Sequence, residues 1–308
     1  MNRVATFGNY QSALLSLMAA QSRGLEAQER VSTQKNATDL TGFGRQSETL
    51  TALTGAQSRL QGFLDTSDAV TARLTTQDLA LTQISDGVDA VRASIGNALA
   101  SDSATSLMLE LEGQFQAVRG GLNMRHQGGY LFAGAQVNTA PVDVSNLTEL
   151  AAAPSVASIF NNDTLKTASR VAEGTTLETG FLANEVGTDV MTILRDIQNY
   201  HTGPNGPLNG KLTETQKAWL GNQLSLLETA GQGVIDKTAT TGSLANQVES
   251  VAKGHTAQLD SLSELVAKRT DADMAKAVTD LQLSQVAIEA SAQVINQLRQ
   301  VSLLNFLS

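Results

Sequence analysis

The residue types best suited to chemistry are sparse and badly spaced in this sequence. Its histidines are His126, His201 and His255, and none has a His, Asp or Glu three or four residues away on either side. Ligand pairs at those steps are typical of metal sites on helices. We therefore expect the three histidines to be ordinary polar surface residues, and we predict no catalytic residues and no metal ligands.

Two glycine-containing stretches fall short of nucleotide-binding motifs. In GPNGPLNGKL (203–212), Asn205 stands where a phosphate loop has its first glycine, and Lys211 is followed by Leu212 instead of Ser or Thr. GFG (42–44) lacks the third glycine of a dinucleotide site, and no predicted strand precedes it. The sequence also has no Cys, which excludes thiol nucleophiles and disulfides. We predict a turn at 203–212 and no cofactor.

The net charge of the chain disfavours two classes of binding partner. The net charge is −9 and the pI is about 4.9, which disfavours nucleic acid and anionic membrane surfaces because both are bound through clustered Lys and Arg. No run approaches the roughly 18 apolar residues of a membrane-spanning helix. The short apolar stretch ALLSLMAA (13–20) is also a poor signal peptide. We expect no nucleic acid partner, no membrane insertion and no cleaved signal.

The sequence predicts long helices on both sides of its central stretch. Every proline lies between Pro141 and Pro207, so both flanks are free of the strongest helix breaker. A heptad seam with Ser67 as its only polar interruption predicts one helix over residues 45–100. The seam residues are Leu53, Leu60, Leu74, Leu81, Val88 and Ile95. A third predicted helix follows, with a stripe made by Leu107, Leu111, Val118 and Leu122.

Both ends of the chain are also predicted to be helical. Apolar residues near the amino terminus recur at Tyr10, Leu14, Leu17 and Val31, with Gly24 weakening the middle. The last helix has one stripe through Ile288 and Ile295, and a second stripe made by Leu283, Val286, Val294, Val301 and Leu304. The chain then ends in QVSLLNFLS, which contains Val301, Leu303, Leu304, Phe306 and Leu307. A helix that is apolar on two faces needs several packing partners, so we predict that both ends order by assembly.

The central stretch has no helical period. Residues 139–189 mix β-branched residues, glycines and prolines, which predicts a small β-rich insertion. The fold class is therefore mainly α, with a long coiled-coil helical bundle formed by both termini and a small β-rich inserted outer domain.

Four stretches resemble the flagellar hook-associated, hook-filament junction proteins, which are relatives of flagellin. The strongest match is LQLSQVAIEASAQVINQLRQVSLLNFL (281–307), which is similar to the flagellin-type terminal helix. The other stretches are RVSTQKN (30–36), GGYLFAGAQVNTAPV (128–142) and GSLANQVES (242–250). The sequence departs from the family pattern at NATDLTGFG (36–44), where a lone Asp39 without proline replaces paired aspartates with proline.

The resemblance implies an architecture and a role. Residues 1–35 and 265–308 would form a terminal inner domain, 36–138 and 190–264 a helical middle domain, and 139–189 the outer domain. The chain would be exported by the flagellar secretion system with the help of an export chaperone, and would lie outside the cell in the flagellum. It would assemble with itself, in a ring or helical assembly, between the hook-side junction protein and flagellin.

The assembly interface is predicted at the apolar residues of the two ends: Tyr10, Leu14, Leu17, Val31, Ile288, Ile295, Val301, Leu303, Leu304, Phe306 and Leu307. Two other readings stay open. One is a flagellin filament subunit, and the other is a cytosolic coiled-coil signalling protein, which would need neither a β-rich insertion nor an apolar carboxyl end.

Overall fold

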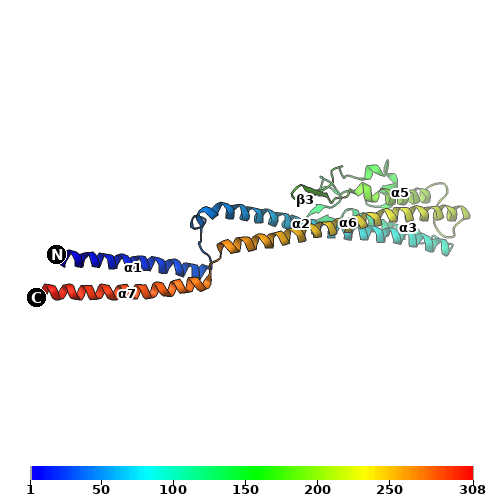
Figure 1. The fold of residues 1–308 in the computed structure, drawn as a ribbon. Coiled ribbons are helices and arrows are strands. Elements are labelled where there is room, and N and C mark those ends of the chain that lie inside the picture. The colour runs from blue at the N-terminus through cyan, green and yellow to red at the C-terminus, as the bar shows by residue number, and fades with distance from the viewer. Residues whose placement is uncertain (1, 308) are drawn as a thin grey trace. The chain divides into compact units, whose positions relative to one another are not determined.

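The computed structural model describes the backbone of residues 2–307 and the side chains of residues 8–300. Helices dominate it, as predicted (Figure 1). The long helices are α1 (Asn2–Thr33), α2 (Ser47–Ala100), α6 (Glu214–Thr270) and α7 (Met274–Leu307). The shorter ones are the 3₁₀ helix η1 (Thr41–Gln46), α3 (Leu107–Leu122), α4 (Leu147–Ala152), the 3₁₀ helix η2 (Ala157–Ile159) and α5 (Ala183–Thr202). The predicted helix over 45–100 is confirmed as α2.

The described strands form two antiparallel hairpins. β1 (Arg125–His126) pairs with β2 (Gly129–Tyr130), and β3 (Ala168–Ala172) pairs with β4 (Thr175–Glu178). The predicted β-rich stretch 139–189 therefore contains one two-stranded sheet, together with α4, η2 and irregular chain.

The chain divides into two compact units. The first contains residues 1–59 and 258–308, and the second contains residues 60–257. α2 and α6 contribute residues to both units. The predicted division into inner, middle and outer domains remains a prediction.

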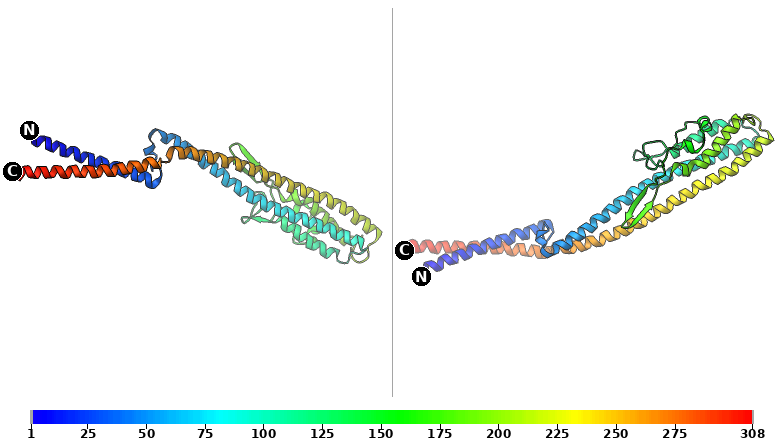
Figure 2. Two further views of the ribbon diagram at one scale, coloured as in Figure 1. Left: turned by 60° about the horizontal axis from the view of Figure 1, so that its bottom comes forward. Right: turned by 90° about the horizontal axis from the view of Figure 1, so that it is seen from above.

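In the first unit, α1 and α7 lie side by side and run antiparallel (Figures 1 and 2). A short loop region between α1 and α2 precedes the 3₁₀ helix η1. Asp39 Oδ1 accepts hydrogen bonds from the Thr41 hydroxyl and the Gly42 N–H, and these bonds hold the pKa of Asp39 below its usual value. Gly44 has a positive φ of 52° inside η1, which only glycine adopts readily. Asp39 thus stabilises the start of η1, and Gly44 allows the bend between η1 and α2.

The second unit has a four-helix core. α2, α3, α5 and α6 share one cluster of buried apolar side chains. Its members include Leu81, Ile84, Val88, Ile95, Leu107, Leu111, Phe115, Val118, Leu122, Val190, Leu194, Ile197, Leu220, Leu227 and Val234. Gly121 permits close packing here, because a Cβ at that position would lie 2.6 Å from Ile84 Cγ1 and 3.0 Å from the Ala80 carbonyl oxygen.

A second, smaller cluster attaches the β3–β4 hairpin to the long helices (Figure 2). Val171 and Leu177 pack with Val70 and Leu74 of α2 and with Val248 of α6. The pairing register shifts between Arg170 and Ala172, so Val171 sits at a bulge. Its carbonyl oxygen lies 2.9 Å from Nε2 of His255. The expectation that His255 is a surface residue is wrong, because this side chain is only 8% exposed and stacks on Phe63.

Candidate assembly interface

α1 and α7 meet through small side chains. Ala20, Gly24 and Ala27 are buried on α1, and Ala277 and Ser284 are buried on α7. A Cβ added at Gly24 would lie 3.5 Å from the Cβ of Ser284 and 3.7 Å from Cδ1 of Ile288. The two helices therefore approach closely, and little apolar surface is removed from water between them.

The large apolar side chains of α1 lie outside this seam. Leu14, Met18 and Leu25 are 40%, 59% and 69% exposed. Their spacing of four and seven residues places them on one face of the helix. Leu15, 67% exposed, lies beyond this face. α1 thus buries Ala20, Gly24 and Ala27 and exposes Leu14, Met18 and Leu25, whereas a helix that completes its own core buries its large apolar residues.

α7 also exposes large apolar side chains. Leu283, Val286 and Val294 are 62%, 63% and 47% exposed, and their spacing of three and eight residues again selects one face. These residues belong to the second stripe predicted from the sequence. Val301 and Leu304 would continue that stripe, but their side chains lie outside the described residues.

These exposed faces carry few charges. No charged residue occurs between Val4 and Ser22, and Glu289 and Arg299 are the only ones between Leu281 and Leu307. The cores of protein interfaces are depleted of charged residues in the same way. An apolar helix face of this length with few charges is typical of a surface that another polypeptide covers.

Residues 34–36, which follow α1, contact residues 270–272, which lead into α7. We call this group of polar contacts the clasp. The N–H of Asn36 donates to the Thr270 carbonyl oxygen over 2.7 Å, and the N–H of Ala272 donates to the Gln34 carbonyl oxygen over 2.9 Å. The Lys35 ammonium forms a salt bridge with the Asp271 carboxylate. This bond, together with one from Thr270, holds the pKa of Asp271 below its usual value.

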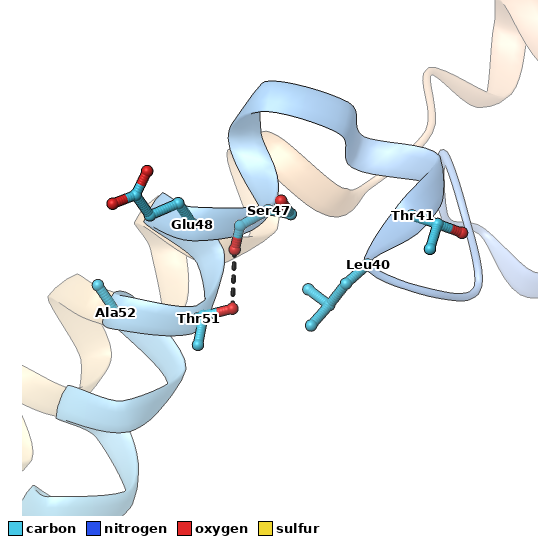
Figure 3. Close-up of a pocket in the computed structure, with 6 residues that line it drawn as sticks. All are labelled: Leu40, Thr41, Ser47, Glu48, Thr51 and Ala52. Carbon is cyan, nitrogen blue, oxygen red and sulfur yellow. Dashed lines mark hydrogen bonds between the residues drawn. The ribbon is translucent and has the colours of Figure 1, made fainter.

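An open cavity of about 580 Å³ lies where η1 meets α2 (Figure 3). Leu40 projects toward the first turn of α2, where the Thr51 hydroxyl donates to the Ser47 carbonyl oxygen over 2.8 Å. Leu40 is half-exposed, so this cavity adds a further apolar surface to the first unit.

The structure separates the predicted interface residues into two groups. Leu17, Val31, Ile288 and Ile295 are half-buried at positions of the α1–α7 seam, whereas Tyr10 and Leu14 are exposed. The side chains of Val301, Leu303, Leu304, Phe306 and Leu307 lie outside the described residues. Sequence reasoning missed Met18 and Leu25, although the lack of charge around Met18 and the four- and seven-residue steps from Leu14 were signals that could have found them.

The seam residues predicted within α2 differ along its length. Leu74, Leu81, Val88 and Ile95 are buried, whereas Leu53 and Leu60 are half-buried. The polar interruption, Ser67, is also buried, and its hydroxyl donates to the Phe63 carbonyl oxygen over 2.9 Å.

Across residues 2–307, no helix combines the length and the apolarity that a bilayer crossing requires. No group of three or more His, Asp or Glu side chains among the described residues could hold a metal ion.

Comparison with known proteins shows a match over one region of the chain and a shared fold. Residues 224–307 match the bacterial flagellin C-terminal helical region. Similar solved structures include a Vibrio parahaemolyticus protein assigned as flagellar hook-associated, with 14% identity and a TM-score of 0.59 over 73% of this chain and 97% of that one. The chain has the fold of flagellar hook-associated proteins.

Two further structures share this flagellar hook-associated fold. Bacillus cereus FlgL is 16% identical, with a TM-score of 0.54 over 70% of this chain and 98% of that one. Xanthomonas campestris FlgL is 14% identical, with a TM-score of 0.55 over 70% and 99%. No curated protein matches the chain. At these identities the similarity establishes the fold, and the flagellin-type region covers α7 and much of α6.

Proposed function

We propose that this chain is a structural, non-catalytic subunit of the bacterial flagellum that forms the junction between a hook-side adaptor and the filament. One observation carries the proposal. α1 and α7 pair through small residues and leave large apolar side chains exposed on faces with few charges, including Leu14, Met18 and Leu25. Supporting it are the flagellin-type region and the fold of the FlgL structures.

Covering these exposed apolar faces with another polypeptide would stabilise the assembled protein. Each fully buried large aliphatic side chain stabilises a structure by about 1.5–3 kcal/mol relative to an exposed one. The α1–α7 pair leaves most of that free energy unrealised, because its seam buries Ala, Gly and Ser. Copies of the same chain, flagellin and the hook-side junction protein are the partners that we propose to cover the faces. Val301, Leu303, Leu304, Phe306 and Leu307 would extend this contact.

The test replaces exposed apolar residues without touching the α1–α7 seam. The double variant Met18→Gln, Leu25→Gln is expressed in cells of the source bacterium that lack their own copy. We expect flagellin to be lost to the medium instead of forming attached filaments, while the purified full-length variant unfolds at the same temperature as the wild type. Leu165→Gln is the control, since Leu165 is equally exposed, at 65%, on a loop of the second unit. Normal filament attachment in the double variant would refute the proposal.

A flagellin filament subunit is the second candidate, because the flagellin-type region at 224–307 favours it. The two roles differ in position and copy number. Gold-labelled antibody against this chain should mark only the boundary between hook and filament if it is a junction subunit, and the whole filament if it is flagellin. A cytosolic coiled-coil protein would be absent from the external flagellar fraction altogether.

A further inference from the structure

The loop that joins α5 to α6 holds both Asn-Gly pairs of the sequence. Asn205 precedes Gly206, Asn209 precedes Gly210, and both asparagines are exposed. An Asn-Gly pair is chemically labile, because a glycine has no side chain to keep its own peptide nitrogen away from the preceding asparagine. The contacts of each peptide unit therefore decide which of the two pairs can react.

The peptide unit between Asn205 and Gly206 is held on both sides. The Asn205 carbonyl oxygen accepts a hydrogen bond from Nε2 of Gln216 over 3.0 Å, and Gln216 is buried. The Gly206 N–H donates to the Gly203 carbonyl oxygen over 3.1 Å. Gly206 is also closely packed, since a Cβ at this position would collide with the His201 carbonyl oxygen. This peptide unit cannot turn without breaking two hydrogen bonds.

The peptide unit between Asn209 and Gly210 lacks these restraints. In the described part of the chain, no group accepts from the Gly210 N–H or donates to the Asn209 carbonyl oxygen. Gly210 has a positive φ of 65°, and nothing lies within 4 Å of the place where its Cβ would be. This peptide unit can therefore turn toward the Asn209 side chain without losing a hydrogen bond to the protein.

We propose that Asn209 is a site of spontaneous deamidation. The Gly210 nitrogen gives its proton to water and attacks the side-chain carbonyl carbon of Asn209, and ammonia leaves. Water then opens the cyclic succinimide at either carbonyl, which gives an aspartyl or isoaspartyl residue at position 209. Water is the only co-reactant, and nothing is oxidised or reduced. The inference does not depend on the proposed function.

The modified position would adjoin a contact between two loops. The Gly210 carbonyl oxygen accepts from the Ala104 N–H over 2.7 Å, and the Lys211 ammonium lies 3.9 Å from the Asp102 carboxylate. An isoaspartyl residue lengthens the main chain by one methylene group immediately before this contact. Both products also add a negative charge two residues before Lys211. The positive φ of Gly210 favours glycine there, so the turn itself maintains the labile pair.

The experiment incubates the purified full chain in mildly alkaline buffer for several days, either native or unfolded in urea. Peptides are prepared at acidic pH, where deamidation is slow, and mass spectrometry with electron-transfer fragmentation distinguishes Asn205 from Asn209. In the native chain we expect at least about tenfold more product at Asn209, because two hydrogen bonds must break before Asn205 can react. In urea the two positions should react at similar rates, because the fold no longer restrains either one.

The matched variants are Asn209→Ser and Asn205→Ser. Asn209→Ser should remove most of the isoaspartate that forms in the native chain, measured as methyl groups transferred by an isoaspartyl methyltransferase. Asn205→Ser should leave that amount unchanged. Three results would each overturn the proposal: equal product at both positions of the native chain, a preference for Asn205, or no product at native Asn209 while the urea-unfolded chain reacts there.

Discussion

His255 donates its Nε2–H to the carbonyl oxygen of Val171, 2.9 Å away, and so links α6 to the bulge of the β3–β4 hairpin. A carbonyl oxygen can only accept, which fixes the proton on Nε2. The imidazole also stacks on Phe63 of α2, with ring centroids 5.4 Å apart. One side chain therefore touches three elements of the second unit.

Replacing this side chain should loosen the hairpin. We predict that His255→Ala lowers the free energy of unfolding of the second unit by about 1–3 kcal/mol, because the buried Val171 carbonyl loses its donor. Urea denaturation followed by circular dichroism measures the change. Lys253→Ala is the control, since Lys253 forms only an exposed ion pair with Glu249 and such pairs contribute little. Equal stability of His255→Ala and wild type would show that the hairpin is held without this bond.

The clasp predicts a pH dependence in the first unit. The Asp271 pKa is lowered in the folded chain, chiefly by the Lys35 ammonium. A lowered carboxyl pKa adds stability above its unfolded value, near 4, and that stability is lost as the pH falls through the folded value. We therefore expect amide hydrogen exchange at residues 34–36 and 270–272 to accelerate, relative to the intrinsic exchange rate of each amide at the same pH, below about pH 4.

The variant Asp271→Asn should remove this particular acceleration, because the amide does not titrate. Glu289→Gln, which changes an exposed carboxyl on α7, should leave it in place. If wild type and Asp271→Asn respond identically between pH 5 and pH 3 (roughly the range in which carboxyls titrate), the Lys35–Asp271 salt bridge does not contribute to the clasp.

Substitution by alanine should change stability in opposite directions at Gly24 and Gly121. At Gly24 a methyl group meets Ser284 and Ile288 at ordinary contact distances, so Gly24→Ala should stabilise α1 by about 0.5–1 kcal/mol through helix propensity. At Gly121 the methyl group would collide with Ile84 and the Ala80 carbonyl oxygen. Gly121→Ala should therefore destabilise the second unit by about 1–3 kcal/mol. Thermal unfolding of both variants checks the signs, and a shift in the same direction for both would contradict the packing described here.

The elements that could be predicted from sequence are those marked by large apolar residues. The steps from Leu74 to Ile95 identified α2, and the absence of proline from both flanks indicated long helices. Ser67 interrupted the pattern without breaking the helix, because its hydroxyl is satisfied by the Phe63 carbonyl oxygen within the same helix.

The seam between α1 and α7 could not be found in that way. A count of large apolar residues does not detect Ala20, Gly24 and Ala27. Gly24 even seemed to weaken the apolar stripe of the first helix. It is buried because it faces Ser284 and Ile288 of α7, where even an added methyl group would make only ordinary contacts. His255 was missed for a related reason, since its partner is a backbone carbonyl 84 residues away in sequence.

The antiparallel course of α1 and α7 brings Asn2 and Leu307 to the same end of the first unit (Figure 1). A purification tag or fluorescent protein fused at either extremity would consequently crowd the same patch of the molecule. An epitope placed at Gly174, in the tight turn between β3 and β4, would leave both extremities unencumbered for imaging the protein in living cells.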